Sequence, residues 1–170
     1  YKVGFMAAYQ DNFANPNTGV KRLIPDYYTY DFGLFTIGNF ALNDATNLDL
    51  GLRYDFNYIN AKKFYFKSRW EERNYDIEYT DLIIGDYNRE WLVNPKFKYH
   101  NFSASAGISH QLNENNSVLF NYALSSRAPN PSELFSDGLH HSAARIELGD
   151  LRMPQERSNR VSASYNFEND

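Results

Sequence analysis

Residues 47–58, NLDLGLRYDFNY, alternate apolar and polar side chains without an exception. Successive side chains of a β-strand point to opposite faces, so this pattern predicts a strand with one apolar and one polar face. In residues 30–42, Phe35, Ile37 and Ala41 fall on the polar side, which predicts a bulge or a locally buried inner face there. The same alternation elsewhere makes the chain all-β, with six predicted strands over residues 1–9, 30–42, 47–58, 102–112, 117–126 and 159–167.

The predicted connections are of two kinds. Residues 42–46 and 112–116 are short turns rich in Asn and Asp, whereas residues 11–26, 60–99 and 127–157 form long connections. Short turns at one end and long loops at the other, on antiparallel strands of roughly ten residues, are typical of a transmembrane β-barrel. The apolar faces would then contact lipid, and the polar faces would line a lumen. Aromatic residues near the strand ends would lie at the membrane interfaces, namely Tyr54, Phe56, Tyr58, Tyr165 and Phe167.

Composition excludes several other classes of protein. The chain has no cysteine, so it has no disulfide framework, and no apolar run approaches the roughly 20 residues that a membrane-spanning helix needs. Residues 64–79 mix basic and aromatic side chains, but acidic residues among them and a net charge of −4 argue against a nucleic-acid partner. Tyr1 falls in the middle of an alternating pattern, so we expect residues 1–170 to be part of a longer protein.

Three other functions fit parts of the pattern. A soluble, lipocalin-like binding barrel has a similar length, but it needs enough strands to close and buries its apolar face inward. A passive porin or an adhesin-type outer-membrane barrel shares the strand pattern. An outer-membrane enzyme could use Ser136, Asp137, His141 and Ser142, although catalysis would require a base held within hydrogen-bond reach of a nucleophile.

Several motifs resemble those of TonB-dependent outer-membrane receptors. RAPNPSELFSDGLHH is followed by ARIELGD, LRMPQERSN and a returning strand, and LGLRYDF and LIPDY resemble earlier segments of these barrels. The resemblance implies a bacterial outer-membrane location and a 22-stranded barrel, of which residues 1–170 would be a part lacking the N-terminal plug domain. It also implies uptake of a scarce chelate (an iron-siderophore, haem or zinc), driven through TonB by a region outside this chain. No permanently bound cofactor is expected.

The same motifs supply residues with an expected structural role. Pro129 cannot donate a hydrogen bond to a sheet, so we expect the strand before it to end there. We expect the charged residues of these motifs to anchor the connection, namely Arg127, Glu133, Glu156 and Arg157.

His140 is the main candidate for contact with a ligand. The resemblance to zinc- and haem-uptake receptors places His140 at the position of their Gly-x-His element, and a neutral imidazole binds zinc or haem iron. Asp137 could add an oxygen ligand, and the adjacent His141 would point to the other side of an extended segment. Two histidines without a third clear ligand do not define a zinc site, so a loop histidine with no metal remains the alternative.

Overall fold

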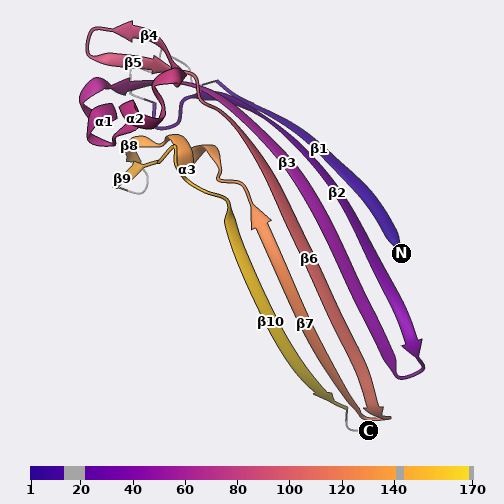
Figure 1. The fold of residues 1–170 in the computed structure, drawn as a ribbon. Coiled ribbons are helices and arrows are strands. Elements are labelled where there is room, and N and C mark those ends of the chain that lie inside the picture. The colour runs from indigo at the N-terminus through magenta and orange to yellow at the C-terminus, as the bar shows by residue number, and fades with distance from the viewer. Residues whose placement is uncertain (14–21, 141–143, 169–170) are drawn as a thin grey trace.

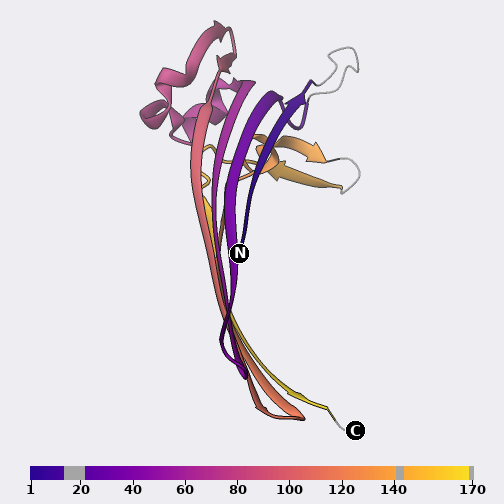
Figure 2. The ribbon, with the colours of Figure 1, turned by 90° about the vertical axis from the view of Figure 1, so that its right-hand side faces the viewer.

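The computed structural model describes residues 1–13, 22–140 and 144–168. Its long strands form one antiparallel sheet in the order β1-β2-β3-β6-β7-β10, and within the described residues β1 and β10 are the edges of this path. The strands form a single curved layer, with the helices and small hairpins gathered at one end (Figures 1 and 2). The prediction of an antiparallel all-β chain is confirmed. The strands are β1 (Lys2–Asn12), β2 (Asp26–Asn43), β3 (Thr46–Phe66), β6 (Lys96–Asn113), β7 (Asn116–Arg127) and β10 (Glu156–Phe167).

The long connection predicted over residues 60–99 is partly wrong. β3 continues to Phe66 and β6 already begins at Lys96. Side chains of β3 still alternate beyond Tyr58, but on the face that is polar further down they pack against the apolar core of the connections. Ile59, Ala61 and Tyr65 on that face are buried, although isolated apolar residues among lysines did not predict a strand. Between the two strands lie α1 (Lys67–Glu72), α2 (Tyr75–Glu78), the 3₁₀ turn η2 (Thr80–Leu82), β4 (Ile83–Tyr87) and β5 (Glu90–Val93).

The connection after β7 contains a short helix and a hairpin. It forms α3 (Pro131–Phe135), β8 (Asp137–His140) and β9 (Arg145–Leu148). Asn130 caps α3 by accepting hydrogen bonds from the backbone of Ser132 and Glu133, and the Glu133 carboxylate accepts one from the backbone of Asn130. This reciprocal capping box, with Pro131 in the first turn, explains why a helix starts directly where β7 ends.

The two faces of the sheet have opposite character. On one face, Val3, Phe5, Leu52, Phe102, Val161 and Tyr165 are 62–76 % exposed, and the register places them with the other apolar positions of their strands. The other face carries the polar positions. A soluble barrel would bury its apolar side, so the lipocalin-like alternative is wrong. No helix of the described residues is long and apolar enough to span a membrane.

The irregular strand of residues 30–42 adapts in two places. A register shift lies between Ala41 and Asn43, beside the turn to β3. Phe35 lies on the polar face, where its ring covers Gly4 of β1 and leaves no room for a side chain there. Phe35 is thus accommodated by a neighbouring glycine and Ala41 by a local shift of register, whereas Ile37 is exposed on the polar face opposite Lys2.

A buried apolar core lies at the end of the sheet that carries the long connections. We call residues 59–95 and 128–155, as far as they are described, the cap. α3 packs on the polar side of β3 and β6, with the rings of Phe97 and Phe135 stacked at 6.4 Å. The members of this core come from residues 59–95 and from residues 128–155, so these two segments pack together as one unit. The core residues are Ile59, Ala61, Tyr65, Trp70, Tyr75, Val93, Leu134, Phe135 and Leu151.

Candidate functional site

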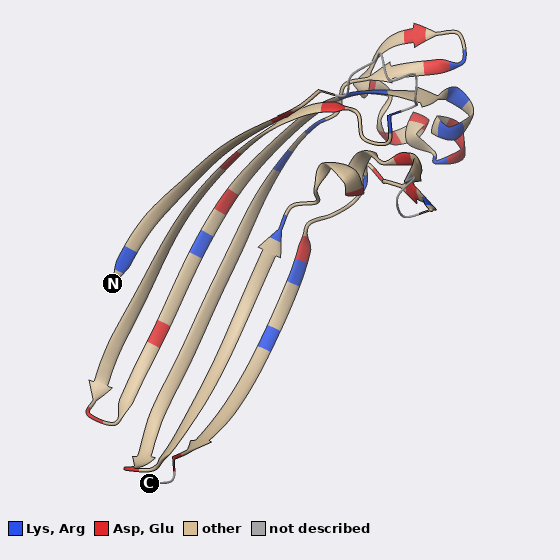
Figure 3. Ribbon diagram, turned by 180° about the vertical axis from the view of Figure 1, so that it is seen from behind, with Lys and Arg blue, Asp and Glu red and all other residues tan. Residues whose placement is uncertain are grey.

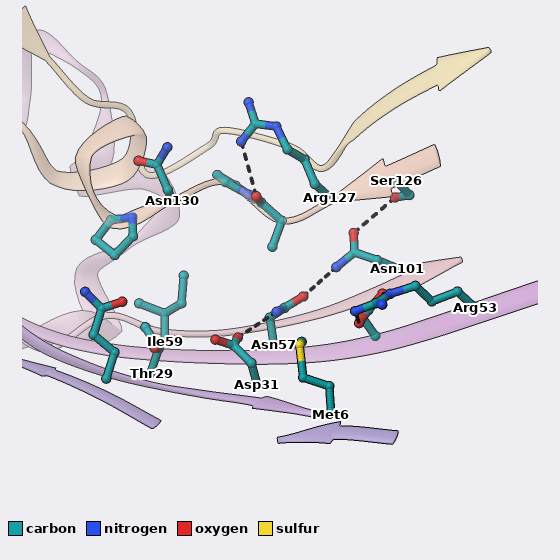
Figure 4. A pocket seen from close by; sticks show the side chains of 15 residues that line it. Met6, Thr29, Asp31, Arg53, Asn57, Ile59, Asn101, Ser126, Arg127 and Asn130 are labelled. Carbon is teal, nitrogen blue, oxygen red and sulfur yellow. Dashed lines mark hydrogen bonds and ion pairs between the residues drawn. The ribbon is translucent and has the colours of Figure 1, made fainter. Parts of the chain in front are cut away.

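The polar face of the sheet is hollowed next to the cap. The hollow has a volume of about 360 Å³ and lies between strands of the sheet and the segment that follows β7 (Figure 4). Concave sites with several convergent polar groups are where proteins bind small ligands, so this hollow is the candidate site. Most of its lining residues are polar or charged: Met6, Gln10, Thr29, Asp31, Arg53, Asp55, Asn57, Ile59, Asn101, Ser126, Arg127, Ala128, Pro129, Asn130 and Pro131.

A chain of hydrogen bonds crosses four neighbouring strands along this wall. Asn57 donates to Asp31 Oδ1 at 2.6 Å, and Asn101 donates to Asn57 Oδ1 at 2.7 Å. Ser126 Oγ then donates to Asn101 Oδ1 at 3.0 Å, and Gln155 Nε2 reaches the same oxygen at 2.9 Å. Asn101 is only 1 % exposed. Buried polar groups that satisfy one another in this way hold their side chains in fixed orientations, so the wall is rigid.

An ion pair lies flat on the polar face next to this chain. Arg53 donates two hydrogen bonds to Asp55, from Nε to Oδ2 at 2.7 Å and from Nη2 to Oδ1 at 2.6 Å. Gly33 lies opposite Asp55 in β2, and a Cβ at Gly33 would collide with the Asp55 carboxylate. The glycine therefore leaves the space that the pair occupies, and the paired charges face the hollow.

Arg127, the last residue of β7, fixes the boundary of the hollow on the side of the cap. Its guanidinium donates to both carboxylate oxygens of Glu133, at 2.9 and 2.8 Å, and forms a 2.5 Å ion pair with Glu156. The hydrogen bonds from Arg127 hold the pKa of Glu133 below its usual range. This arrangement ties the end of β7, the start of α3 and the start of β10 to one side chain. Pro129 lies in the segment between β7 and α3, and Arg157 lies opposite Ser126 in β10.

Thr29 presents a buried hydroxyl at the hollow. The residue is 5 % exposed, and its Oγ1 has no hydrogen-bond partner among the described residues. A buried hydroxyl without a partner is unfavourable by about 1–3 kcal/mol. Thr29 therefore leaves one polar group of the wall without a partner from the described residues beside the hollow.

Asp137 lies in the cap and away from this hollow. Its side chain is buried, forms an ion pair with Arg69, and lies 3.9 Å from Lys63 Nζ. Its backbone N–H donates to Leu23 O at 3.1 Å, which brings the connection before β2 into the same junction. Ser136 beside it is also buried. The Asp137 carboxylate thus joins segments of the cap, and the candidate enzyme residues Ser136 and Asp137 do not lie at an open rim.

The histidine candidates are described only in part. His140 is the last residue of β8, where it pairs with Arg145, and its side chain is outside the described atoms. His141 and Ser142 lie outside the described residues. Across residues 1–13, 22–140 and 144–168 there is no group of three or more His, Cys, Asp or Glu side chains placed to hold a metal ion.

Several residues of the hollow were missed by the sequence analysis because the strands are longer than predicted, as Gln10 and Ile59 show just beyond the predicted ends of two strands. Thr29 and Asn101 each lie one position before a predicted strand, and both strands begin earlier than predicted. Tyr28 and Tyr30 flank Thr29 in continued alternation, and this signal could have extended the strand. Asn101 follows His100, whose position on the apolar face hides the pattern.

The cap is closed by hydrogen bonds between its two connections. Tyr75 Oη donates to Asp150 Oδ1 at 2.7 Å and accepts from the backbone N–H of Leu151 at 3.0 Å. Arg73 donates to Gly149 O at 2.7 Å. Burial and the bond to Asp150 raise the pKa of Tyr75, so its hydroxyl keeps the proton that it donates. The polar contacts therefore fix how the connections pack above the hollow.

The strands and their connections together define a class of protein. An antiparallel sheet with an exposed apolar face, a polar opposite face and long connections folded over one end is the wall of a transmembrane β-barrel. The family model described as "TonB dependent receptor-like, beta-barrel" matches residues 1–170, so the chain belongs to this family of bacterial outer-membrane transporters. The predicted family and location are thereby confirmed. No curated protein and no solved structure matches the chain.

Proposed function

We propose that this chain forms part of the lumen wall and outer mouth of a receptor that takes up a scarce metal chelate. Membership of the family establishes an outer-membrane transporter and, in general, an interaction with TonB. The observation that supports a bulky chelate as cargo is the polar hollow of about 360 Å³, bounded by strands of the sheet and by the capped segment after β7. In barrels of this class the long connections are extracellular, so the hollow would lie just below the outer mouth.

The chemistry of the lining favours a metal that is already chelated. Amide, hydroxyl and paired ionic groups recognise a ligand through hydrogen bonds. An iron-siderophore presents many oxygens and needs no further metal ligand, which suits such a wall. Asp137, the carboxylate considered for a metal, is held in the ion pair with Arg69. An iron-siderophore is therefore our first candidate, and haem and zinc are the alternatives.

Growth and binding assays on the intact receptor test this proposal. A deletion strain should lose growth on one iron-siderophore as iron source, and the wild-type receptor should restore it. Arg53 lines the hollow and is partly exposed, and Arg53→Met keeps most of its length but removes its hydrogen-bond donors, so we expect about fivefold weaker binding of that labelled chelate, near 1 kcal/mol. Arg160→Met makes the same change on the polar face of β10, away from the hollow, and should leave binding unchanged. Growth that is independent of the receptor on iron-siderophores, haem and zinc would reject the proposal.

His140 separates the alternative cargoes. If haem or zinc is bound, His140→Ala should weaken binding at least about tenfold, close to 1.4 kcal/mol, because direct coordination is lost. His141→Ala should have a smaller effect. Unchanged affinity for haem and zinc in both variants would leave the hydrogen-bonded chelate as the cargo.

A further inference from the structure

Four tyrosines form a continuous cluster on the apolar face, near the end of the strands that carries the cap. Ring centroids are 5.1 Å apart for Tyr9 and Tyr30, 5.5 Å for Tyr28 and Tyr30, and 6.2 Å for Tyr30 and Tyr58. Tyr30 and Phe40 are ten positions apart in β2, which is about 33 Å along the strand and about 25 Å along the membrane normal at a tilt near 40°. This matches the height of the apolar band of a barrel. The tyrosine cluster therefore marks the outer membrane interface.

Three lysines lie at this interface and directly beyond it on the same face. Lys98 lies opposite Tyr58, and Lys96 lies opposite Asn60. Lys62 is two residues further along β3, and the ladder continues past Asn60 because Ala61 N donates to Pro95 O at 3.1 Å. Lys62 and Lys96 are therefore diagonal neighbours on adjacent strands, and such neighbours are about 7–8 Å apart. Figure 3 shows positively charged residues on β6 near this end.

The lysine cluster (Lys62, Lys96 and Lys98) is open to a ligand. All three side chains are exposed, and none has an ion-pair partner among the described residues. Asp26 lies opposite Lys62 in β2, where it is paired with Arg22 at 2.7 Å. On this face, β3 from Phe56 to Lys62 and β6 from Lys96 to Phe102 carry no acidic residue. The local charge is therefore positive at the depth of lipid head groups.

We propose that the lysine cluster binds the phosphate groups of a phosphorylated glycolipid of the outer leaflet. Closely spaced ammonium groups bind phosphate through charge-assisted hydrogen bonds, and the tyrosine cluster beside them provides an apolar surface for the start of the acyl chains. Basic residues close to a membrane interface bind anionic head groups in the same way. The site faces outward from the barrel wall, so it is separate from the hollow and does not depend on which cargo is transported.

The intact receptor in a neutral detergent tests this proposal. The probes are bisphosphorylated lipid A and the same lipid with both phosphates removed, with binding measured by native mass spectrometry. Lys96→Gln combined with Lys98→Gln should weaken binding of the phosphorylated lipid at least about tenfold, since each lysine contributes about fivefold. Adding Lys62→Gln should weaken it further. Wild type should bind the dephosphorylated lipid as weakly as the variant does.

A matched control removes two positive charges from the other face. Lys2 and Arg160 lie on the polar face and are exposed, so Lys2→Gln combined with Arg160→Gln should leave lipid binding unchanged. An equal loss in this control would show a general charge effect and overturn the site. Unchanged binding in the Lys96 and Lys98 variant would also overturn it. Full competition by inorganic phosphate at millimolar concentration would overturn the lipid as the occupant.

Discussion

At the scale of single residues, Tyr75 has the most demanding environment in the cap. It is fully buried, its ring packs against Trp70 at 5.1 Å, and its hydroxyl bridges Asp150 and the backbone of Leu151. One side chain thus contributes apolar packing and two hydrogen bonds between the connections. A phenylalanine would keep the packing and lose both bonds.

Tyr75→Phe is expected to loosen the cap while leaving the barrel wall intact. The Leu151 N–H and the Asp150 carboxylate would lose a partner inside the protein, at a cost of about 1–3 kcal/mol. Tyr79→Phe is the control, because the Tyr79 ring packs on Tyr75 but its hydroxyl has no hydrogen-bond partner among the described residues. Hydrogen exchange of residues 67–82 should accelerate in the first variant only. Equal exchange in both variants would show that packing alone fixes the cap.

At the scale of the strands, the two faces have different tolerance for charge. Leu52 lies opposite Thr36 and Ala104, close to the middle of the apolar band between Tyr30 and Phe40. Leu52→Arg should impair assembly in the membrane, because arginine near the bilayer midplane of a barrel costs about 2–4 kcal/mol. Urea unfolding in lipid vesicles and the amount of receptor assembled in the outer membrane both measure this loss.

The same new residue on the polar face provides the comparison. Ser105 is exposed on the polar side of β6, opposite Gly51 of β3 and therefore at nearly the same depth as Leu52, and Ser105→Arg should have little effect on assembly. If Ser105→Arg were the more damaging change, the assignment of the lipid-facing side would be wrong.

The predictability of these elements follows from where their side chains pack. Alternation identified the central part of each strand, because a strand with one apolar and one polar face shows this difference in its own sequence. The outer end of β3 was missed because Ile59, Ala61 and Tyr65 are buried in a core that includes Leu134 and Leu151, which are distant in the sequence. The Arg53–Asp55 pair lies within one strand, whereas the chain from Asp31 to Ser126 needs four strands in register. Local patterns cannot supply that register.

At the scale of the whole molecule, the orientation in the membrane can be tested chemically. The 170 residues contain no cysteine, so single cysteines introduced into them give defined labelling sites. Ser68 lies on α1 in the cap and Glu114 lies in the short turn before β7, and both are exposed. A membrane-impermeant maleimide on intact cells should label Ser68→Cys and not Glu114→Cys, because long connections of such barrels face outward. Both should be labelled after lysis, and labelling of Glu114→Cys alone on intact cells would invert the orientation.

The presence of residues 59 and 151 in one buried core has a consequence for the order of assembly. Most neighbouring strands of the sheet are also neighbours in sequence, so their pairing closes short loops and is entropically cheap. The cap core joins Ile59 and Tyr75 to Leu134 and Leu151, which follow β7 in the sequence, so its formation closes a much longer loop than a hairpin does. We therefore expect the cap to form late, after the hairpins on either side of it. Until the cap forms, its apolar surfaces would stay uncovered. A truncated or incompletely folded chain would therefore expose them to chaperones and proteases.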